Sequence, residues 1–230
     1  MSTAAEDVGN APTEKQVHYL AVYLAGVAGF VDAVGFTKLG GTFVSFMSGN
    51  STKLAVSVAK VSAASVLVAL VIGVFFAGAV AGSLLSFAVP VRRKPLVLVA
   101  VSLGLAAAAL LHLASWDRPA VLGMAAAMGC ANTVFRREDG PYNVGITYMT
   151  GNLVRLADGL VGLVVGRKRP WLPYLLLWAG LLCGAAAGAV LYRALGMTAL
   201  WVAAGAAAVL AVSARNIESP VSTDLPPATH

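Results

Sequence analysis

Two short polar motifs interrupt a strongly apolar chain. Residues 48–55 have the sequence SGNSTKLA, and residues 150–157 have the sequence TGNLVRLA. In each motif a hydroxyl, a glycine and an asparagine are followed three positions later by a basic side chain. Polar and basic groups at the start of a helix can bind an anionic or strongly dipolar solute. The candidate binding residues are therefore Ser48, Gly49, Asn50 and Lys53 in the first motif, and Thr150, Gly151, Asn152 and Arg155 in the second.

The two asparagines, Asn50 and Asn152, allow two interpretations. Each side chain is suited to cap a helix that begins at the next residue, Ser51 or Leu153, by accepting backbone N–H bonds. In the functional interpretation, both helix N-termini lie near the middle of the membrane and attract an anionic or dipolar group. Capping explains the asparagines but not their place inside apolar segments.

Lys53 and Arg155 fall within the first turn after each asparagine, where a cation opposes the helix dipole. A bound anion would relieve that conflict. The alternative is that both long side chains extend to the membrane interface or to a lipid phosphate.

Asp32 lies within the apolar sequence VAGFVDAVGF at 27–36, where a lipid-facing carboxylate would cost about 2.5–3.5 kcal/mol. We expect it to face the interior of the protein. It could pair with Lys53 or Arg155, carry a proton or couple to an ion, or hydrogen-bond to a nearby Ser or Thr. Its counterpart in the second half of the chain is Asn132, so only one half carries the charge.

The motifs belong to a longer internal repeat. Asn152 follows Asn50 by 102 positions, and Arg155 follows Lys53 by the same number. Two further pairs of segments align: GFVDAVGF at 29–36 with GCANTVF at 129–135, and GAVAG at 78–82 with GAAAG at 184–188. A duplicated membrane unit is the natural interpretation, with repeat 1 at about 17–115 and repeat 2 at about 119–213.

Composition predicts an integral membrane protein, because 59% hydrophobic and 11% charged residues leave no polar face for a soluble globule. The predicted fold class is all-α, a polytopic membrane helix bundle. We expect a single membrane domain at 17–213, between disordered cytoplasmic tails at 1–16 and 214–230. A homo-oligomer is left open.

Several functional classes are disfavoured. The net charge of +6 comes from basic residues in short loops beside the apolar segments, as membrane topology requires, so we expect no nucleic-acid partner. No cluster of His, Cys and carboxylate residues indicates a metal site, and we expect no cofactor. An intramembrane hydrolase built on Ser48 and Gly49 would want a glycine at position 46, where this chain has Phe46, so we expect no enzyme.

The apolar segments number eight, but eight need not all cross the membrane. They lie at 17–38, 42–60, 64–90, 95–115, 119–135, 145–165, 171–192 and 197–213. If 42–60 and 145–165 do not fully cross, every basic loop cluster falls on the cytoplasmic side. This predicts six crossings, both termini inside, and two inverted halves of three spans, each with a broken or re-entrant helix at its [ST]-G-N motif.

Two further patterns concern packing. Glycines recur at helix-face spacing in 64–90 and in 171–192, which predicts that these two segments cross closely. Aromatic residues such as Trp116 and Tyr174 fall where an interfacial belt would lie.

The segments GFVDAVGF and FVSFMSGN, followed by AMGCANTVFRR and ITYMTGN, resemble the YoaK-type family of uncharacterised bacterial membrane proteins. The resemblance covers about residues 17–213, with SGN in place of TGN in the first half. It implies a multi-pass protein of the inner membrane and assigns no substrate.

The leading hypothesis is a small-molecule or ion transporter with its site between the two broken helices, anion-selective and coupled to protons through Asp32. A passive channel and a membrane scaffold or assembly subunit are the alternatives. The predicted partners are the lipid bilayer and a small solute or ion.

Overall fold

The computed structural model describes residues 14–135, 149–167, 169–215 and 217, and every regular element in these ranges is a helix. The predicted all-α class is confirmed. The helices are α1 (Glu14–Lys38), α2 (Met47–Ala59), α3 (Ala64–Ala88), η2 (Pro90–Arg92), α4 (Arg93–Leu113), α5 (Asp117–Ala131), α6 (Met149–Val164), α7 (Leu172–Leu195), η4 (Gly196–Ala199) and α8 (Leu200–Ala214). Helix α1 takes in the end of the predicted N-terminal tail; the rest of that tail, and residues 216 and 218–230, lie outside the described residues.

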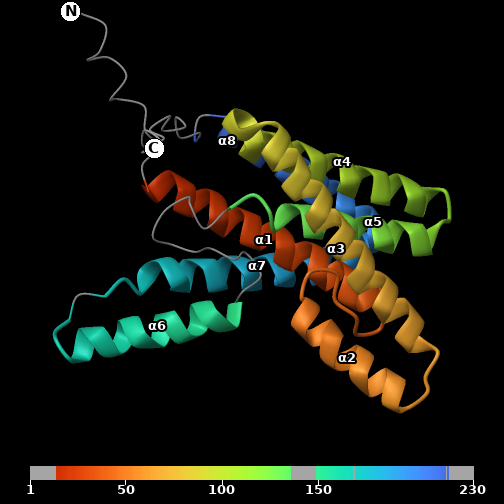
Figure 1. Cartoon of the computed structure of the whole chain (residues 1–230), viewed down its shortest axis with the longest axis horizontal. Coiled ribbons are helices and arrows are strands. Elements are labelled where there is room, and N and C mark those ends of the chain that lie inside the picture. The colour runs from red at the N-terminus through yellow and green to blue at the C-terminus, as the bar shows by residue number, and fades with distance from the viewer. Residues whose placement is uncertain (1–13, 136–148, 168, 216, 218–230) are drawn as a thin grey trace, which may run out of the picture.

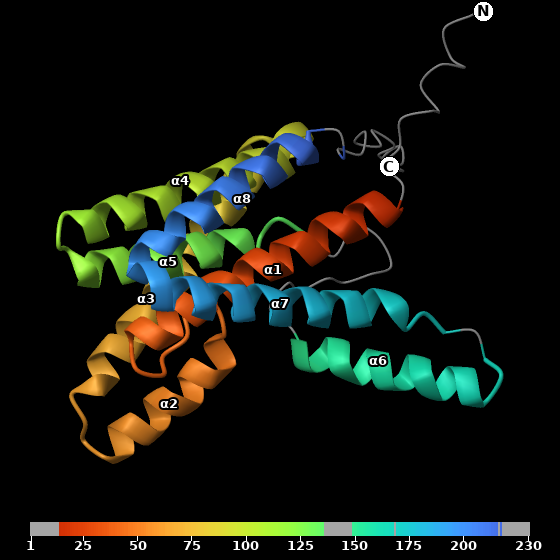
Figure 2. The same ribbon diagram turned by 180° about the vertical axis from the view of Figure 1, so that it is seen from behind.

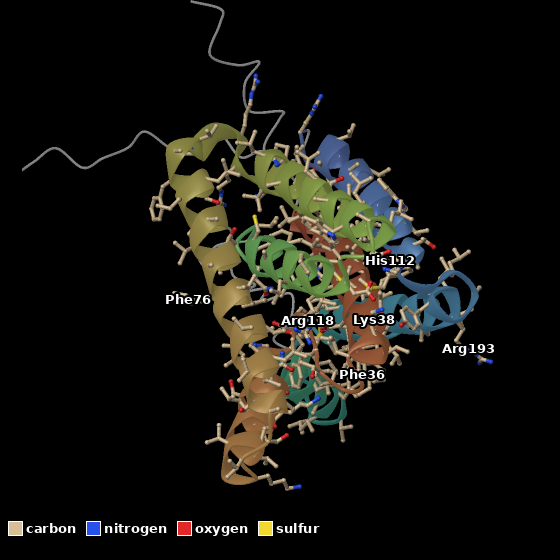
Figure 3. All side chains as sticks on the ribbon, turned by 90° about the vertical axis from the view of Figure 1, so that its right-hand side faces the viewer. Phe36, Lys38, Phe76, His112, Arg118 and Arg193 are labelled. Atoms are coloured by element: carbon tan, nitrogen blue, oxygen red, sulfur yellow. The ribbon has the colours of Figure 1, made fainter. Side chains whose placement is uncertain are left out.

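The protein is a transmembrane helical protein. Four stretches of the described chain are long and apolar enough to cross a membrane, and the last contains both α7 and α8: Lys15–Lys38, Ala64–Ala88, Arg93–Leu113 and Leu172–Ala214. Large apolar side chains point outward from α3; Phe76 is 69% exposed (Figure 3). Such a surface suits a lipid environment. The number of crossings stays a prediction.

Three helix pairs build the bundle: α1 with α7, α3 with α5, and α4 with α8 (Figures 1 and 2). Contacts of α4 with α5 and of α1 with α8 join the pairs. In the predicted repeat, α1 corresponds to α5, α3 to α7 and α4 to α8. The first long helix of each half therefore packs against the third helix of the other half.

Glycines bring α1 and α7 into backbone contact. A Cβ atom at Gly184 would collide with the carbonyl oxygen of Gly26, and a Cβ atom at Gly29 would collide with that of Leu181. Small residues are the usual means by which membrane helices approach each other this closely.

The contact of α3 with α5 repeats this arrangement. A Cβ atom at Gly78 would collide with the carbonyl oxygen of Ala126, and a Cβ atom at Gly129 with that of Phe75. These four residues are the repeat counterparts of the four at the α1–α7 contact. The predicted close crossing of the glycine-bearing helices α3 and α7 with each other is wrong, because each packs instead on the first helix of the opposite half.

Corresponding helices run in opposite directions. In Figure 1, α1 runs from left to right and α5 from right to left, and α4 and α8 lie side by side in opposite directions. An inverted repeat requires this arrangement. The repeat and its inversion across the membrane stay predictions.

Helices α2 and α6 begin near the middle of the molecule and run outward to opposite ends (Figures 1 and 2). With 13 and 16 residues they are about 20 and 24 Å long, shorter than the hydrocarbon core of roughly 30 Å. Helix α2 packs on α3, and α6 packs on α7. The two helices begin at Met47 and Met149, so the predicted starts at Ser51 and Leu153 are wrong.

A large part of the buried core lies where α4 contacts α5 and α8. The largest fully buried side chains there include Leu98, Leu105, Met124, Met128 and Leu200. This core holds the middle of the bundle, from which α2 and α6 project.

Candidate functional site

A cavity of about 320 Å³ lies between the first turns of α2 and α6, and we name it the α2–α6 cavity. Its lining comes from the loop before α2, from the starts of α2 and α6, from α3 and from the end of α5. The lining residues are Ser45, Phe46, Met47, Ser48, Phe75, Asn132, Met149 and Thr150. Three of the predicted site residues are thus brought together: Ser48 from α2, Thr150 from α6, and Asn132 from the position just after α5.

Asn50 is fully buried and is not among the residues that line the cavity. Its side-chain Nδ2 donates to the carbonyl oxygen of Phe43 (2.7 Å), and its Oδ1 accepts from the backbone N–H of Phe43 (3.0 Å). The predicted capping role is wrong, because Asn50 is the fourth residue of α2 and the helix start has no side-chain cap bond. The amide instead fixes the backbone of the loop that leads into α2.

Asn152 occupies the matching position, as the fourth residue of α6, and is 3% exposed. Its Nδ2 lies 3.7 Å from the sulfur of Met149, and the Nδ2 of Asn50 lies 3.7 Å from the sulfur of Met47. Capping of a helix that begins at Leu153 is therefore wrong here as well. In both halves the asparagine holds the methionine that lines the cavity.

The carboxylate of Asp32, on α1, also binds the loop that leads into α2. Its Oδ1 accepts from the backbone N–H groups of Val44 (2.8 Å) and Ser45 (2.7 Å), and its Oδ2 accepts from the hydroxyl of Ser45 (2.5 Å). Among the described residues, no ion pair joins it to Lys53 or Arg155, so that predicted pairing is wrong. The hydrogen bond to a neighbouring serine, one of the three predicted roles, is present. Because Ser45 lines the cavity, Asp32 helps to set the shape of its wall.

Asn132 differs from its counterpart Asp32. It follows the last residue of α5, its Nδ2 donates to the carbonyl oxygen of Met128 (2.8 Å), and it lines the cavity itself. The carboxylate of Asp32 thus anchors the loop before α2 and does not line the cavity, whereas the amide of Asn132 lines the cavity directly. The two counterparts differ in position as well as in charge.

The two basic residues do not line the cavity. The ammonium group of Lys53 donates to the hydroxyl of Thr42 (2.7 Å), which belongs to the loop before α2. The guanidinium carbon of Arg155 lies 5.6 Å from the centre of the Tyr174 ring on α7, a cation–π arrangement. Each cation has a partner within the protein, and the structure does not place either beside the cavity.

The motif glycines have separate roles. A Cβ atom at Gly49 would collide with the ring of Phe46, so glycine lets this cavity-lining ring lie against α2. Gly151 lies in the first turn of α6 and is partly buried, outside the cavity lining.

Sequence reasoning missed five lining residues. Met47 and Met149 had a usable signal, because a methionine stands at the same position before each glycine in FMSGN and YMTGN. Ser45 and Phe46 adjoin the first motif. Phe75 had no signal of its own, because it comes from α3 and reaches the cavity only through tertiary packing.

The chemistry of the cavity follows from its lining. The side chains offer three hydroxyls, one amide, two aromatic rings and two thioethers, and none of the lining residues is charged. Four of the lining residues belong to the first turns of α2 and α6. The N–H groups of a first helical turn have no acceptor within their own helix. The site is suited to hold a small solute by hydrogen bonds and apolar contact. Among the described residues, no group of three His, Cys, Asp or Glu side chains could hold a metal ion.

A second polar cluster lies at the end of α1. Lys38 Nζ is 2.5 Å from Asp117 Oδ2, and His112 Nδ1 is 2.6 Å from Asp117 Oδ1. The Lys38 ammonium and the His112 ring hold the pKa of the Asp117 carboxyl below its ordinary value. Figure 3 shows Lys38, His112 and Arg118 together at this end of the molecule. The cluster joins α1 to the start of α5.

Comparison with known proteins agrees with this architecture. Residues 20–213 match the model of a family described as "Protein of unknown function (DUF1275)". The chain is also 37% identical over 202 residues to "UPF0700 transmembrane protein RA0705" of Rhizobium meliloti (strain 1021), and the match covers 86% of each chain. No solved structure matches. The predicted kinship with uncharacterised bacterial membrane proteins is confirmed: the chain belongs to the DUF1275 family of transmembrane proteins.

Proposed function

We propose that the protein carries a small solute or ion across the bacterial inner membrane and binds it in the α2–α6 cavity. The observation that carries the proposal is that three polar residues, Ser48 on α2, Thr150 on α6 and Asn132 just after α5, meet at one cavity of a predominantly apolar protein. Polar groups at membrane depth are costly and usually serve a solute pathway. Short helices that begin near the middle of a bundle are found at the binding sites of secondary transporters.

The lining favours an anionic or strongly dipolar substrate. Two helix N-termini contribute to the wall, and none of the lining residues is acidic. The phenyl rings of Phe46 and Phe75 favour a substrate that also has an apolar part. A volume of about 320 Å³ lies at the lower end of the range for small-molecule sites, so we propose a small metabolite or ion.

The proposed topology has six crossings, inverted halves and both termini in the cytoplasm. It is supported by the shortness of α2 and α6, by the opposed directions of corresponding helices and by the matched glycine contacts of the two halves. Single cysteines at Ser62 and Arg169, in a chain whose Cys130 and Cys183 are replaced by alanine, test it with an impermeant thiol reagent on intact cells. Labelling at 62 and not at 169 is expected; labelling of both from one side would exclude inverted halves.

Asp32 is the proposed coupling group. A proton on its carboxylate would remove an acceptor from the bonds to Val44 and Ser45 and would change the loop that forms one cavity wall. Protonation would thereby alter the binding site without direct contact between Asp32 and the substrate.

Transport is tested with purified protein in liposomes, by recording currents on a solid-supported membrane after addition of chloride, phosphate, small carboxylates or amino acids. Ser48→Phe fills the cavity and should lower the initial rate at least tenfold. Ser51→Phe, at an exposed position of the same helix outside the cavity lining, is the matched control and should leave the rate unchanged. Equal loss in both variants would exclude the cavity as the pathway.

The same liposomes test the coupling. A proton-coupled carrier accumulates its substrate when a pH gradient is imposed, and Asp32→Asn should abolish that accumulation. Flux that is indifferent to the gradient would indicate a passive channel. Absence of flux for every solute would favour a scaffold.

A further inference from the structure

A second hollow, of about 530 Å³, opens at the end of the bundle where α1 ends and where α3 and α5 begin; we name it the Arg118 cleft. One wall is apolar and comes largely from the first two turns of α3, with Val66, Leu67 and Leu70. The other is polar and consists of Lys38, Asp117 and Arg118. The cleft is separate from the α2–α6 cavity and shares no lining residue with it.

The polar wall carries an excess of positive charge. The charge of Lys38 is matched by Asp117, which also contacts His112. Arg118 is exposed, and within the described part of the chain it has no ionic partner. Figure 3 shows Arg118 and Lys38 beside each other at this end. A guanidinium in this position is well suited to bind a phosphate.

Trp116, two residues before Arg118, indicates the depth of the cleft in the membrane. Trp116 is 62% exposed, and exposed tryptophans of membrane proteins gather at the level of the lipid headgroups. The exposed side chains of Val66 and Leu70 belong to α3, one of the stretches that can cross a membrane. The cleft therefore presents its basic group at headgroup level and its apolar wall along a membrane-crossing helix.

We propose that the Arg118 cleft binds an anionic diacyl phospholipid, with its phosphate at Arg118 and an acyl chain along Val66, Leu67 and Leu70. The charge and the apolar wall point to the same ligand. A free phosphate would satisfy Arg118 but leave the apolar wall uncovered, whereas a neutral lipid would cover the wall but leave the positive charge unmatched.

The experiment compares lipid retention by the purified full-length protein. Wild type and Arg118→Gln are titrated in detergent with phosphatidylglycerol or with phosphatidylcholine, and bound lipid is counted by native mass spectrometry. One basic residue at a membrane surface changes the affinity about fivefold, so Arg118→Gln should weaken phosphatidylglycerol binding by about that factor. Arg193→Gln, at the exposed end of α7, is the matched control and should bind as wild type does.

A second pair of variants tests the apolar wall. Leu70→Trp fills the cleft, whereas Leu84→Trp makes the same change on an exposed position of α3 outside it. Phosphatidylglycerol binding should fall only in Leu70→Trp. The proposal is overturned if both tryptophan variants bind alike, if Arg118→Gln and Arg193→Gln bind alike, or if phosphatidylcholine binds as tightly as phosphatidylglycerol. Competition by inorganic phosphate as effective as that by the lipid would show a phosphate site and would also overturn it.

Discussion

Alanine substitution at the paired glycines gives the sharpest test of the packing. A Cβ atom at Gly184 would collide with the backbone of Gly26 on α1, and a Cβ atom at Gly78 would collide with the backbone of Ala126 on α5. Backbone atoms cannot rotate away, so the helices must move apart. Overpacking of this kind costs about 1–3 kcal/mol, and the better helix propensity of alanine offsets at most about 1 kcal/mol of that. Each variant should lose about 1–2 kcal/mol of stability, and the two losses should be alike because the contacts are counterparts.

Two other glycines serve as controls for the same change. Nothing lies within 4 Å of a Cβ atom built at Gly73 on α3 or at Gly205 on α8. Alanine at these positions should leave stability unchanged or raise it by up to about 1 kcal/mol. The measurement is reversible unfolding in mixed micelles with increasing dodecyl sulfate. If Gly184→Ala unfolds at the same point as Gly73→Ala, the backbone contact is not there; if Gly78→Ala and Gly184→Ala differ by more than about 1 kcal/mol, the two interfaces are not equivalent.

Three further predictions concern buried and charged polar groups. Asp32→Asn should lower the free energy of unfolding by about 1–3 kcal/mol, because a carboxylate oxygen that accepts hydrogen bonds becomes an amide nitrogen; unchanged unfolding in the same titration would show that the carboxylate does not anchor the loop. Asn50→Ala should expose the preceding loop to proteolysis at a higher rate than in wild type, because the backbone N–H and C=O of Phe43 lose their amide partner; an unchanged cleavage rate would contradict this. The Lys38 ammonium holds the pKa of Asp117 below its ordinary value of about 4, so this contact stabilises the fold above that pH and its contribution is lost as the pH falls through the lowered pKa. Melting temperatures of wild type and Asp117→Asn should differ at pH 7 and converge as the pH falls through the lowered pKa of Asp117, and a difference that stays constant would be the contrary result.

The sequence was sufficient to predict the helices, but it identified only three of the eight residues that line the candidate site. Apolar length and turn-forming breaks defined the helical segments to within a few residues, because these signals are local. The repeated motifs also identified Ser48 and Thr150, because each motif contributes to the first turn of one of the two short helices. Both residues line the same cavity.

The errors concern the starts of the two short helices and the partners of particular residues and helices. Asn50 was expected to cap a helix, but its amide binds Phe43, since α2 starts one turn earlier than the Gly-Asn break indicated. An ion pair was one of three predicted roles for Asp32, but its carboxylate accepts hydrogen bonds from nearby backbone N–H groups and a serine hydroxyl instead. A glycine pattern shows that one face of a helix packs closely against another helix, but it does not identify that helix. For this reason α3 was predicted to pack on α7, whereas it packs on α5.

The exchanged pairing of the long helices has a consequence for how the protein is made. Helix α1 leaves the ribosome first, yet the helix that covers its glycines is α7, which follows after more than 130 further residues. Until α7 is inserted, α1 has no partner of matching shape, and the same holds for α3 until α5 arrives. Neither half can reach its final packing alone, so a gene cut between the halves yields two products that must meet in the membrane before either is folded.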